Sequence, residues 1–321
     1  MNKGLKIWLI AGTALLLLGL ILFGGVMTML RWDFSKLSTQ KYDTREHEIK
    51  ESFQSVTVVT KTADVTFLPS EGDDARVVCY EQKKMAHTVT LADGTLKIEL
   101  HDTRKWYDYI GFDFDSPKLT VYLPAEVYGA LCVTVSTGCV SIPSDLSFER
   151  IDVKSTTGDV TCSASVKDEI FIQTSTGDIT LEGVTARTLS LSVSTGKVSV
   201  KDAQCEGGVS VTVSTGKTQL TNLSCGTLFS EGDTGSILLS GVIAQGRMEI
   251  ERDTGDVHLD GCDAAEIVIE TDTGDVTGTL LSEKVFVPRS DTGRIEVPET
   301  TSGGLCKITT DTGDIQIDIV K

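Results

Sequence analysis

A Thr-Gly pair recurs ten times, at intervals of 19 or 20 residues, through the C-terminal two-thirds of this chain. Self-similarity at a fixed period of this length is the signature of a stacked repeat architecture. The repeat glycines are Gly138, Gly158, Gly177, Gly196, Gly216, Gly235, Gly255, Gly274, Gly293 and Gly313. Each repeat is therefore predicted to form one coil of a solenoid.

Alignment of the copies on this glycine separates inward from outward positions. The residues seven and five before the glycine, and two and four after it, are apolar in nearly every copy; the first copy has Leu131, Val133, Val140 and Ile142. Spacing by two with β-branched residues is typical of strands. We expect each repeat to run strand, tight turn, strand and short return loop. The predicted fold is all-β: a single-stranded β-solenoid (β-helix) of about ten coils, preceded by a β cap and one transmembrane helix.

The turn changes character halfway along the array. Glycine suits a turn that needs a positive φ, and a Ser, Thr or Asp two residues earlier can accept a hydrogen bond from the turn backbone. That earlier residue, called position −2 below, is Ser or Thr in the first five copies. In the last five it is Asp: Asp233, Asp253, Asp272, Asp291 and Asp311.

Stacking of the coils would turn these aspartates into a ladder. Neighbouring carboxylates about 5 Å apart repel by about 1 kcal/mol in water and by roughly 3 to 4 kcal/mol at an effective dielectric of 20. Such a ladder would favour a cation such as Ca²⁺, or a cationic ligand. Alternatively, solvent and turn hydrogen bonds satisfy the groups. A second column, just after the glycine, would contain Asp256, Asp275 and Asp314 and be interrupted by Arg294.

The chain's net charge of −17 is concentrated in the repeats. Residues 126–321 carry 14 Lys plus Arg against 30 Asp plus Glu, whereas residues 1–125 carry 15 against 16. Binding of phosphate needs a basic surface, so we expect no nucleic-acid partner. A cationic peptide, a divalent ion or a basic face of a protein or other cell-surface ligand fits better.

The N-terminus predicts a membrane location. Residues 1–6 form a short tail with two lysines, and residues 7–30 are apolar over a length that can span a bilayer. No cleavage motif of a secretory signal follows, so we expect an uncleaved anchor with the solenoid on the extracytoplasmic side. Residues 31–50 are polar without a strand pattern and are predicted to be a juxtamembrane stalk.

Residues 51–125 are predicted to cap the solenoid. The segment from Ser55 resembles a degenerate first coil, and Ala92-Asp93-Gly94-Thr95 indicates a hairpin turn. An insertion after His101 is rich in aromatic residues and could either cover the solenoid end as a lid or stack on a ligand such as a sugar. These residues are Trp106, Tyr107, Tyr109, Phe112 and Phe114.

Cysteine and histidine give no clear site. The eight cysteines lack Cys-x-x-Cys or other metal-ligand spacing, and we interpret them as small buried thiols. Cys205 and Cys225 share a phase, so they should stack on adjacent coils, where they could be bridged. The four histidines are scattered, and the repeats fix no catalytic triad or acid pair. We therefore predict no catalytic residues, no cofactor beyond the Ca²⁺ considered above, and no confident metal site.

Several segments together resemble a known family. These are the membrane span, the Arg-Trp-Asp-Phe-Ser-Lys-Leu-Ser-Thr segment after it, the Ala-Asp-Val-Thr-Phe-Leu-Pro coil, Leu-Thr-Val-Tyr-Leu-Pro and the serial Ser-Thr-Gly-Asp-Val turns. They are similar to the adhesin-like family DUF4097, common in Gram-positive bacteria, over nearly the whole chain. The resemblance implies a β-solenoid envelope protein with an adhesive or stress-related role and no catalytic residues. Cys139, Lys197, Lys217 and Arg294 depart from the family's turn, which usually has Asp there.

These observations favour a membrane-anchored module that binds or displays. An envelope-stress sensor or regulator that contacts a membrane partner through its span and cap is the main alternative. A β-helix enzyme acting on polysaccharide would need a polar cluster that breaks the repeat at one place, and the repeats contain none. Ice binding would need two threonines per coil on a flat face, whereas this sequence has one at a turn edge.

Overall fold

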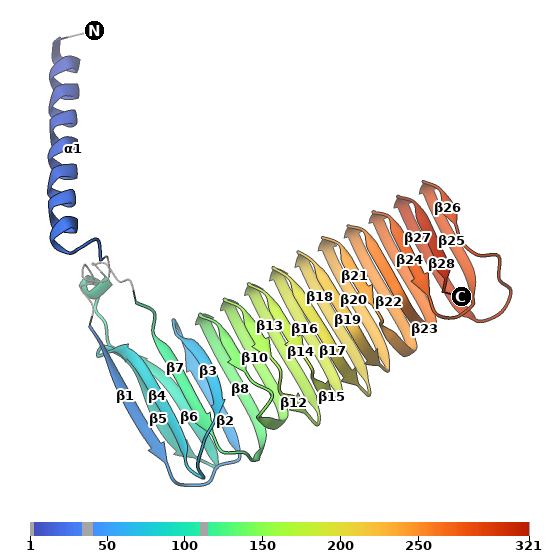
Figure 1. Ribbon diagram of the computed structural model, residues 1–321, viewed down its shortest axis with the longest axis horizontal. Coiled ribbons are helices and arrows are strands. Elements are labelled where there is room, and N and C mark those ends of the chain that lie inside the picture. The colour runs from blue at the N-terminus through green and yellow to red at the C-terminus, as the bar shows by residue number, and fades with distance from the viewer. Residues whose placement is uncertain (1–2, 34–40, 110–114, 321) are drawn as a thin grey trace.

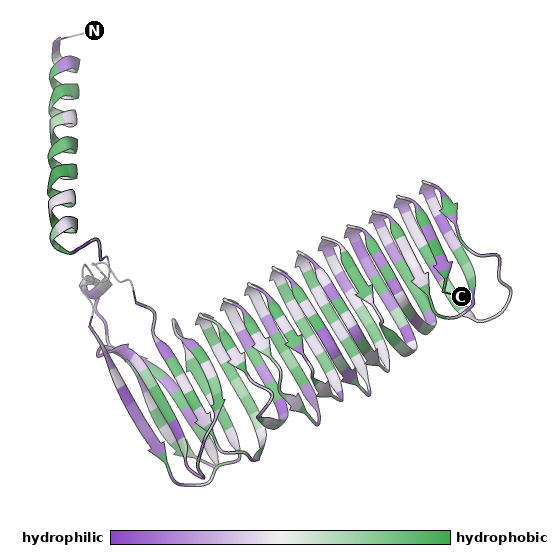
Figure 2. Cartoon of the chain, viewed as in Figure 1, coloured by the Kyte–Doolittle hydropathy of each residue, from purple (hydrophilic) through white to green (hydrophobic). Residues whose placement is uncertain are grey.

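The computed structural model describes residues 3–33, 41–109 and 115–320, and Figure 1 shows a helix followed by a long β rod. Helix α1, Lys3–Met29, has the length and apolar composition needed to cross a membrane. Figure 2 shows mostly apolar and neutral residues along the helix, in contrast to the alternating pattern of the strands. The predicted fold class is confirmed: an N-terminal apolar helix, a β cap and a solenoid of about ten coils.

In its described residues the cap contains seven strands and one short 3-10 helix: β1 Tyr42–Ile49, β2 Ser55–Thr60, β3 Asp64–Pro69, β4 Ala75–Gln82, β5 Met85–Ala92, β6 Thr95–Asp102, η2 Trp106–Tyr109 and β7 Lys118–Leu123. The expected hairpin is confirmed, because β5 pairs antiparallel with β6 and both turn residues, Asp93 and Gly94, have positive φ. The degenerate first coil is also present, since β2 and β3 pair in parallel with the first two strands of the repeats.

The coils comprise β8 Val127–Thr137, β9 Val140–Ile142, β10 Ser147–Thr157, β11 Val160–Cys162, β12 Ser165–Val166, β13 Glu169–Thr176, β14 Ile179–Glu182, β15 Thr185–Ala186, β16 Thr188–Thr195, β17 Val198–Cys205, β18 Gly208–Thr215, β19 Thr218–Cys225, β20 Thr227–Thr234, β21 Ile237–Ser240, β22 Ile243–Thr254, β23 Val257–Thr273, β24 Val276–Leu280, β25 Lys284–Thr292, β26 Ile295–Glu296, β27 Gly304–Thr312 and β28 Ile315–Ile319.

Two parallel walls enclose the core. Strands that precede the Thr-Gly turns pair in register along one wall, as in Leu131↔Ile151↔Ile170, and strands that follow the turns form the other, as in Val140↔Val160↔Ile179. The inward columns are buried almost throughout. A coil that buries so few side chains depends on its neighbours, so stability resides in the stack. At about 4.8 Å per rung, ten coils form a rod roughly 45 to 50 Å long.

The predicted stalk is wrong for its second half. Residues Tyr42–Ile49 form β1, which pairs antiparallel with β4 at the outer edge of the cap. The strand has no apolar alternation, because its inward-facing positions include Arg45 and His47. Charged residues are a common feature of edge strands, since they discourage pairing with other chains.

The last two coils exchange places relative to their order in the sequence. Strand β27 pairs with β23 on one side and with β25 on the other, so the coil of Gly313 lies between the coils of Gly274 and Gly293. The returning chain enters through Gly303 and Gly304, where an added Cβ would lie 1.8 Å and 1.9 Å from carbonyl oxygens of the flanking coils. The coil of Gly293, with Pro288 in β25, therefore ends the rod, and proline is tolerated in an edge strand.

Candidate functional site

The Thr-Gly turns bring successive coils into unusually close contact. Nine of the ten repeat glycines have positive φ, between 134° and 159°, which confirms the expected conformation; Gly293 does not. All ten share a second constraint that the turn pattern did not predict. A Cβ added at any of them would lie 1.7 to 2.3 Å from a carbonyl oxygen of the adjacent coil. Glycine is therefore required by backbone packing between coils as well as by φ.

The column of aspartates just after the glycine has a structural role. Asp256 Oδ1 accepts a hydrogen bond from the backbone N–H of Asp275, and Asp275 Oδ1 accepts one from Asp314. Asp314 in turn accepts one from the backbone of Arg294 and forms an ion pair with its guanidinium at 2.9 Å. These bonds hold the pKa of Asp314 below its usual range. The expectation that Arg294 interrupts this column is wrong: because the last coils exchange places, Arg294 ends it.

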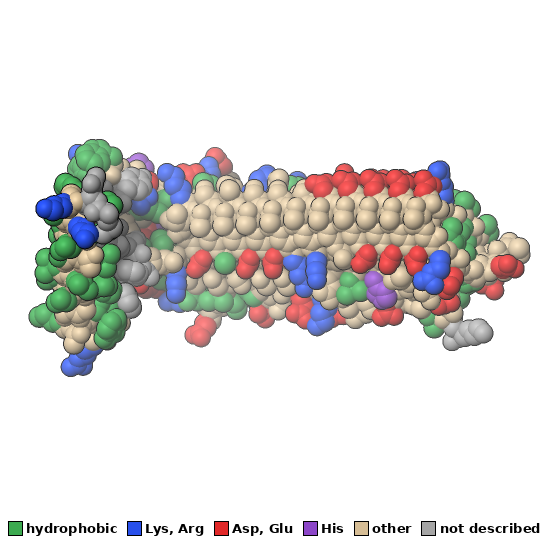
Figure 3. Space-filling model, turned by 90° about the horizontal axis from the view of Figure 1, so that it is seen from above, with side chains coloured by type: hydrophobic (Ala, Val, Ile, Leu, Met, Phe, Trp, Pro, Cys, Tyr) green, Lys and Arg blue, Asp and Glu red, His purple; other side chains and the backbone are tan. Residues whose placement is uncertain are grey.

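The aspartates of position −2 form a different kind of row, called the acidic edge below: Asp233, Asp253, Asp272, Asp311 and Asp291 in spatial order. All five are exposed. Within the described chain, only Asp291 has a hydrogen-bond or ion-pair partner, the guanidinium of Arg289 at 3.1 Å. The hydrogen bond from the turn backbone that we expected at this position is absent from all five of these described residues. Figure 3 shows the result, a line of acidic groups along the C-terminal half of one edge.

A second acidic row, which we did not predict from the sequence, lies on the same outer face. Glu231, Glu251 and Glu270 lie two residues before Asp233, Asp253 and Asp272 and pair in register with one another. Alternate residues of a strand point to the same side, so the two rows are adjacent. Of the three glutamates, Glu270 is paired, with Lys307 Nζ at 2.6 Å. The alignment of the repeats on glycine contains this pattern, as a glutamate four residues before Gly235, Gly255 and Gly274.

A buried guanidinium lies beneath the start of the acidic edge. Arg252 is 3% exposed, and its Nη2 donates to Thr218 Oγ1 at 2.9 Å and Ser230 Oγ at 3.2 Å. Thr218 and Ser230 are polar exceptions in the apolar columns, and Gly232 leaves the space that Arg252 Nη1 occupies. Burial lowers the pKa of Arg252, and the charges of Asp233 and Glu231 oppose that shift. The guanidinium therefore offsets part of the repulsion within the acidic edge.

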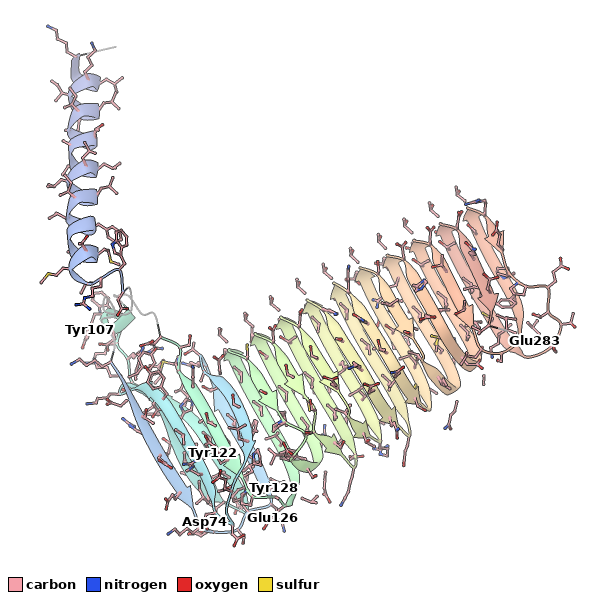
Figure 4. The ribbon with its side chains drawn as sticks, in the orientation of Figure 1. Asp74, Tyr107, Tyr122, Glu126, Tyr128 and Glu283 are labelled. Atoms are coloured by element: carbon pink, nitrogen blue, oxygen red, sulfur yellow. The ribbon has the colours of Figure 1, made fainter. Side chains whose placement is uncertain are left out.

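The aromatic insertion does not form a lid where it is described. Trp106 is 77% exposed and Tyr107 is 48% exposed; their rings meet edge to face at 5.9 Å. Figure 4 shows Tyr107 at the end of the cap near helix α1, away from the coils. Tyr109 closes η2, and Phe112 and Phe114 lie outside the described residues. The lid interpretation is therefore wrong for Trp106 and Tyr107, which remain available for contact.

The cysteines follow the prediction of small thiols in most cases. All eight are free; six are buried, Cys132 is half-buried and Cys139 is exposed. Cys205 and Cys225 lie on adjacent coils as expected, next to the pair Gln204↔Ser224. Burial raises the pKa of the Cys205 thiol to about 11 and that of Cys225 to about 12.

Several solved structures are similar to this chain. They include a "putative adhesin" of Bacteroides fragilis (14% identity, 88% of this chain and 99% of that one, TM-score 0.45) and a "putative adhesin" of Parabacteroides merdae (12% identity, 88% and 98%, TM-score 0.45). A third is a "putative lipid binding protein" of Parabacteroides distasonis (11% identity, 88% and 98%, TM-score 0.33). No curated protein matches the chain. The family model "Toastrack DUF4097" matches residues 53–220 and 206–321, which together cover the cap from β2 onward and every coil, and the chain therefore belongs to the DUF4097 family.

Proposed function

We propose that this protein is a single-pass, membrane-anchored binding module whose rod lies outside the cytoplasm and takes a cationic ligand along its acidic edge. The observation that carries the proposal is the row of four exposed carboxylates, Asp233, Asp253, Asp272 and Asp311, which have no hydrogen-bond or ion-pair partner within the described chain. A positive ligand that neutralises carboxylates about 4.8 Å apart removes their mutual repulsion, and this favours binding.

The anchor rests on helix α1. Its length and composition suit a membrane span, and Trp8 and Trp32 stand near its ends, where interfacial aromatic residues are common. Lysines precede the span, and Arg31 follows it, so the charge bias that favours an inside N-terminus is small. A rod attached to such a helix would present its coils to ligands beyond the membrane surface.

A polycation fits the acidic edge better than Ca²⁺. A calcium ion takes six to eight oxygen ligands that converge on one point. The carboxylates of the acidic edge instead form a line along the rod, with the glutamate row beside it. A linear arrangement of like charges matches an extended chain that carries several positive groups, such as a basic peptide.

The test measures binding of an oligolysine peptide to the full chain in detergent, by fluorescence anisotropy at low and high salt. The variant Asp233→Asn, Asp253→Asn, Asp272→Asn removes three charges without disturbing a described bond. Its matched control, Glu71→Gln, Asp73→Asn, Asp74→Asn, removes three exposed charges from the cap.

We expect the first variant to weaken binding at least tenfold and the control to leave it within about twofold, because the control charges lie more than a Debye length from the acidic edge at physiological salt. Equal losses of affinity in both variants would refute the proposal, because they would show that the peptide is attracted by net charge alone. Calorimetry with millimolar Ca²⁺ completes the test. A heat of binding that is lost in the first variant would show that the acidic edge binds calcium, and calcium would then replace the polycation as the proposed ligand.

The regulator alternative predicts a partner within the membrane. A pull-down of envelope proteins with helix α1 intact, and with α1 replaced by an unrelated span, separates the two functions. Partners lost on replacement would favour a regulator. Retained surface binding that depends on Asp233, Asp253 and Asp272 would favour the binding module.

A further inference from the structure

A cluster of metal-binding side chains is buried inside the cap, between its two walls. Cys79 and Glu81 are alternate residues of β4, and His87 lies on β5; the Gln82–Met85 turn joins these strands across the core. The three residues are 0%, 1% and 5% exposed. Their sulfur, oxygen and ring nitrogen atoms all lie within 4.8 Å of one another. They are three different residue types within nine positions of the sequence, and they match no Cys-x-x-Cys or His-x-x-His spacing.

The hydrogen bonds of the cluster orient these atoms inward. Glu81 Oε2 lies 2.7 Å from both the backbone nitrogen and Nδ1 of His87, and His87 Nε2 lies 2.9 Å from Thr60 Oγ1. At 2.7 Å, the metal-free geometry has His87 Nδ1–H donating to Glu81 Oε2. The other tautomer, with the proton on Nε2 donating to Thr60 Oγ1, would free the Nδ1 lone pair for a metal ion. An oxygen that accepts the ring's remaining N–H, as Thr60 Oγ1 would, commonly fixes the orientation of a metal-binding histidine.

The cluster is incompletely satisfied as it stands. Glu81 Oε1 and His47 Nε2 are two of only five buried side-chain atoms in the described chain that lack a hydrogen-bond partner. Buried polar atoms are rarely left without partners, since each costs free energy. His47 lies on β1 opposite Val77, one diagonal step from Cys79 on the same face. Both unsatisfied atoms therefore belong to one small region of the cap.

We propose that Cys79, Glu81 and His87 bind one divalent d-block metal ion, with Zn²⁺ as the best match. Thiolate sulfur, imidazole nitrogen and carboxylate oxygen are the ligands that zinc takes in proteins, at about 2.3, 2.0 and 2.0 Å. Two ligands 2.0 Å from a tetrahedral ion lie roughly 3.3 Å apart. The present 2.7 Å between Glu81 Oε2 and His87 Nδ1 thus needs to open by about 0.6 Å. Binding would release the Cys79 thiol proton to solvent, and the His87 proton would lie on Nε2, donating to Thr60 Oγ1.

Arg45 lies beside the site, and its positive charge opposes binding of a metal ion. Its Nη1 lies 3.6 Å from Glu81 Oε1, and its side chain is 41% exposed, so the guanidinium can move into solvent while the carboxylate stays in place. It is the one cation within ion-pair distance of Glu81 in the described chain, apart from the His87 ring. Replacing Arg45 by Gln should therefore tighten metal binding tenfold or more, even at the dielectric of water.

The experiment titrates Co²⁺ into the full, reduced chain in detergent and follows the thiolate-to-cobalt charge-transfer band, with displacement by Zn²⁺. One equivalent is expected to saturate the band. Cys79→Ala should abolish it and His87→Gln should weaken it at least tenfold. The matched control, Cys162→Ala, removes another fully buried strand cysteine that has no histidine or carboxylate beside it, and should leave the band unchanged.

The Arg45→Gln variant tests the proposal even where the core substitutions unfold the cap, because it leaves all three ligands in place and is expected to raise the affinity for Co²⁺. The proposal is overturned by a folded wild-type chain that shows no band at millimolar Co²⁺, or by a band that survives Cys79→Ala. A band lost on Cys162→Ala, or unaffected affinity in Arg45→Gln, would overturn it as well.

Discussion

Gly216→Ala tests whether close backbone packing between coils holds the solenoid together. Gly216 has a φ of 143°, and a Cβ there would lie 1.7 Å from the carbonyl oxygen of Gly196. Side-chain carbons do not approach an oxygen closer than 3.0 Å. The two coils must therefore separate locally by at least about 1.3 Å.

The cost follows from the bonds that this movement breaks. Two ladder hydrogen bonds between these coils flank the contact, from Gly196 N to Thr215 O at 3.0 Å and from Val198 N to Lys217 O at 2.9 Å. Their loss costs about 1 to 3 kcal/mol together. An alanine at this φ adds about 1 to 3 kcal/mol. We expect the coils around Gly216 to lose about 2 to 6 kcal/mol of local stability.

Gly183→Ala is the matched control. Gly183 also has a positive φ, 69°, but an added Cβ meets no atom within 4 Å. Only the backbone term remains, about 1 to 2 kcal/mol. The assay is peptide-level amide hydrogen exchange on the full chain in urea, because repeat arrays do not unfold in one step and need a local measurement. If both variants lose the same stability to within about 0.5 kcal/mol, close packing is not the reason for the repeat glycine.

Three further predictions follow from the structure. The exchanged coils predict that Thr273→Cys forms a disulfide with Thr312→Cys, one rung or about 4.8 Å away, but not with Thr292→Cys, two rungs away. Peptide mass spectrometry after oxidation identifies the linked pair, and a disulfide between positions 273 and 292 would show that the coils stack in sequential order. Arg252→Met should change the local free energy of unfolding by less than about 1 kcal/mol. Removing a buried guanidinium whose Nε and Nη1 lack hydrogen-bond partners within the described chain offsets the loss of two hydroxyl contacts and of a charge that moderates repulsion along the acidic edge. A loss of more than about 2 kcal/mol by amide hydrogen exchange would show that these contacts dominate. Asp102→Asn should destabilise the cap at pH 7, because hydrogen bonds from the Arg104 guanidinium hold the pKa of this carboxyl well below its usual range. That stabilisation is present above the unfolded pKa near 3.9 and is lost as the pH falls further. A difference in stability between wild type and variant that stays constant down to pH 2 would contradict this prediction.

The repeat glycines and the inward columns could be predicted from the sequence because they depend on local periodicity. Alternation by two determines which side chains point inward in any strand, whatever its neighbours are. Strand β1 could not be found in this way, since its inward residues Arg45 and His47 are polar and only pairing with β4 defines it. The acidic edge was visible as a change at position −2, whereas the partners that distinguish it from the hydrogen-bonded Asp256 column were not.

Residues that break the pattern were visible, but their convergence was not. Thr218 and Ser230 appeared as isolated polar exceptions in two different columns, and only the stacked coils show that both contact Arg252. Cys79, Glu81 and His87 likewise carried no recognisable spacing until the β4–β5 turn placed them across one core.

The sequence by itself determined the period, the turn and the inside and outside of every coil, because each is written in residues a few positions apart. The tertiary structure alone decided which coils are neighbours. Every coil presents the same ladder of backbone donors and acceptors, so the hydrogen bonds do not distinguish one coil from another. Packing at the chain's end, through Gly303, Gly304 and the edge strand with Pro288, placed the coil of Gly313 inside the rod and made Arg294 the end of its aspartate column.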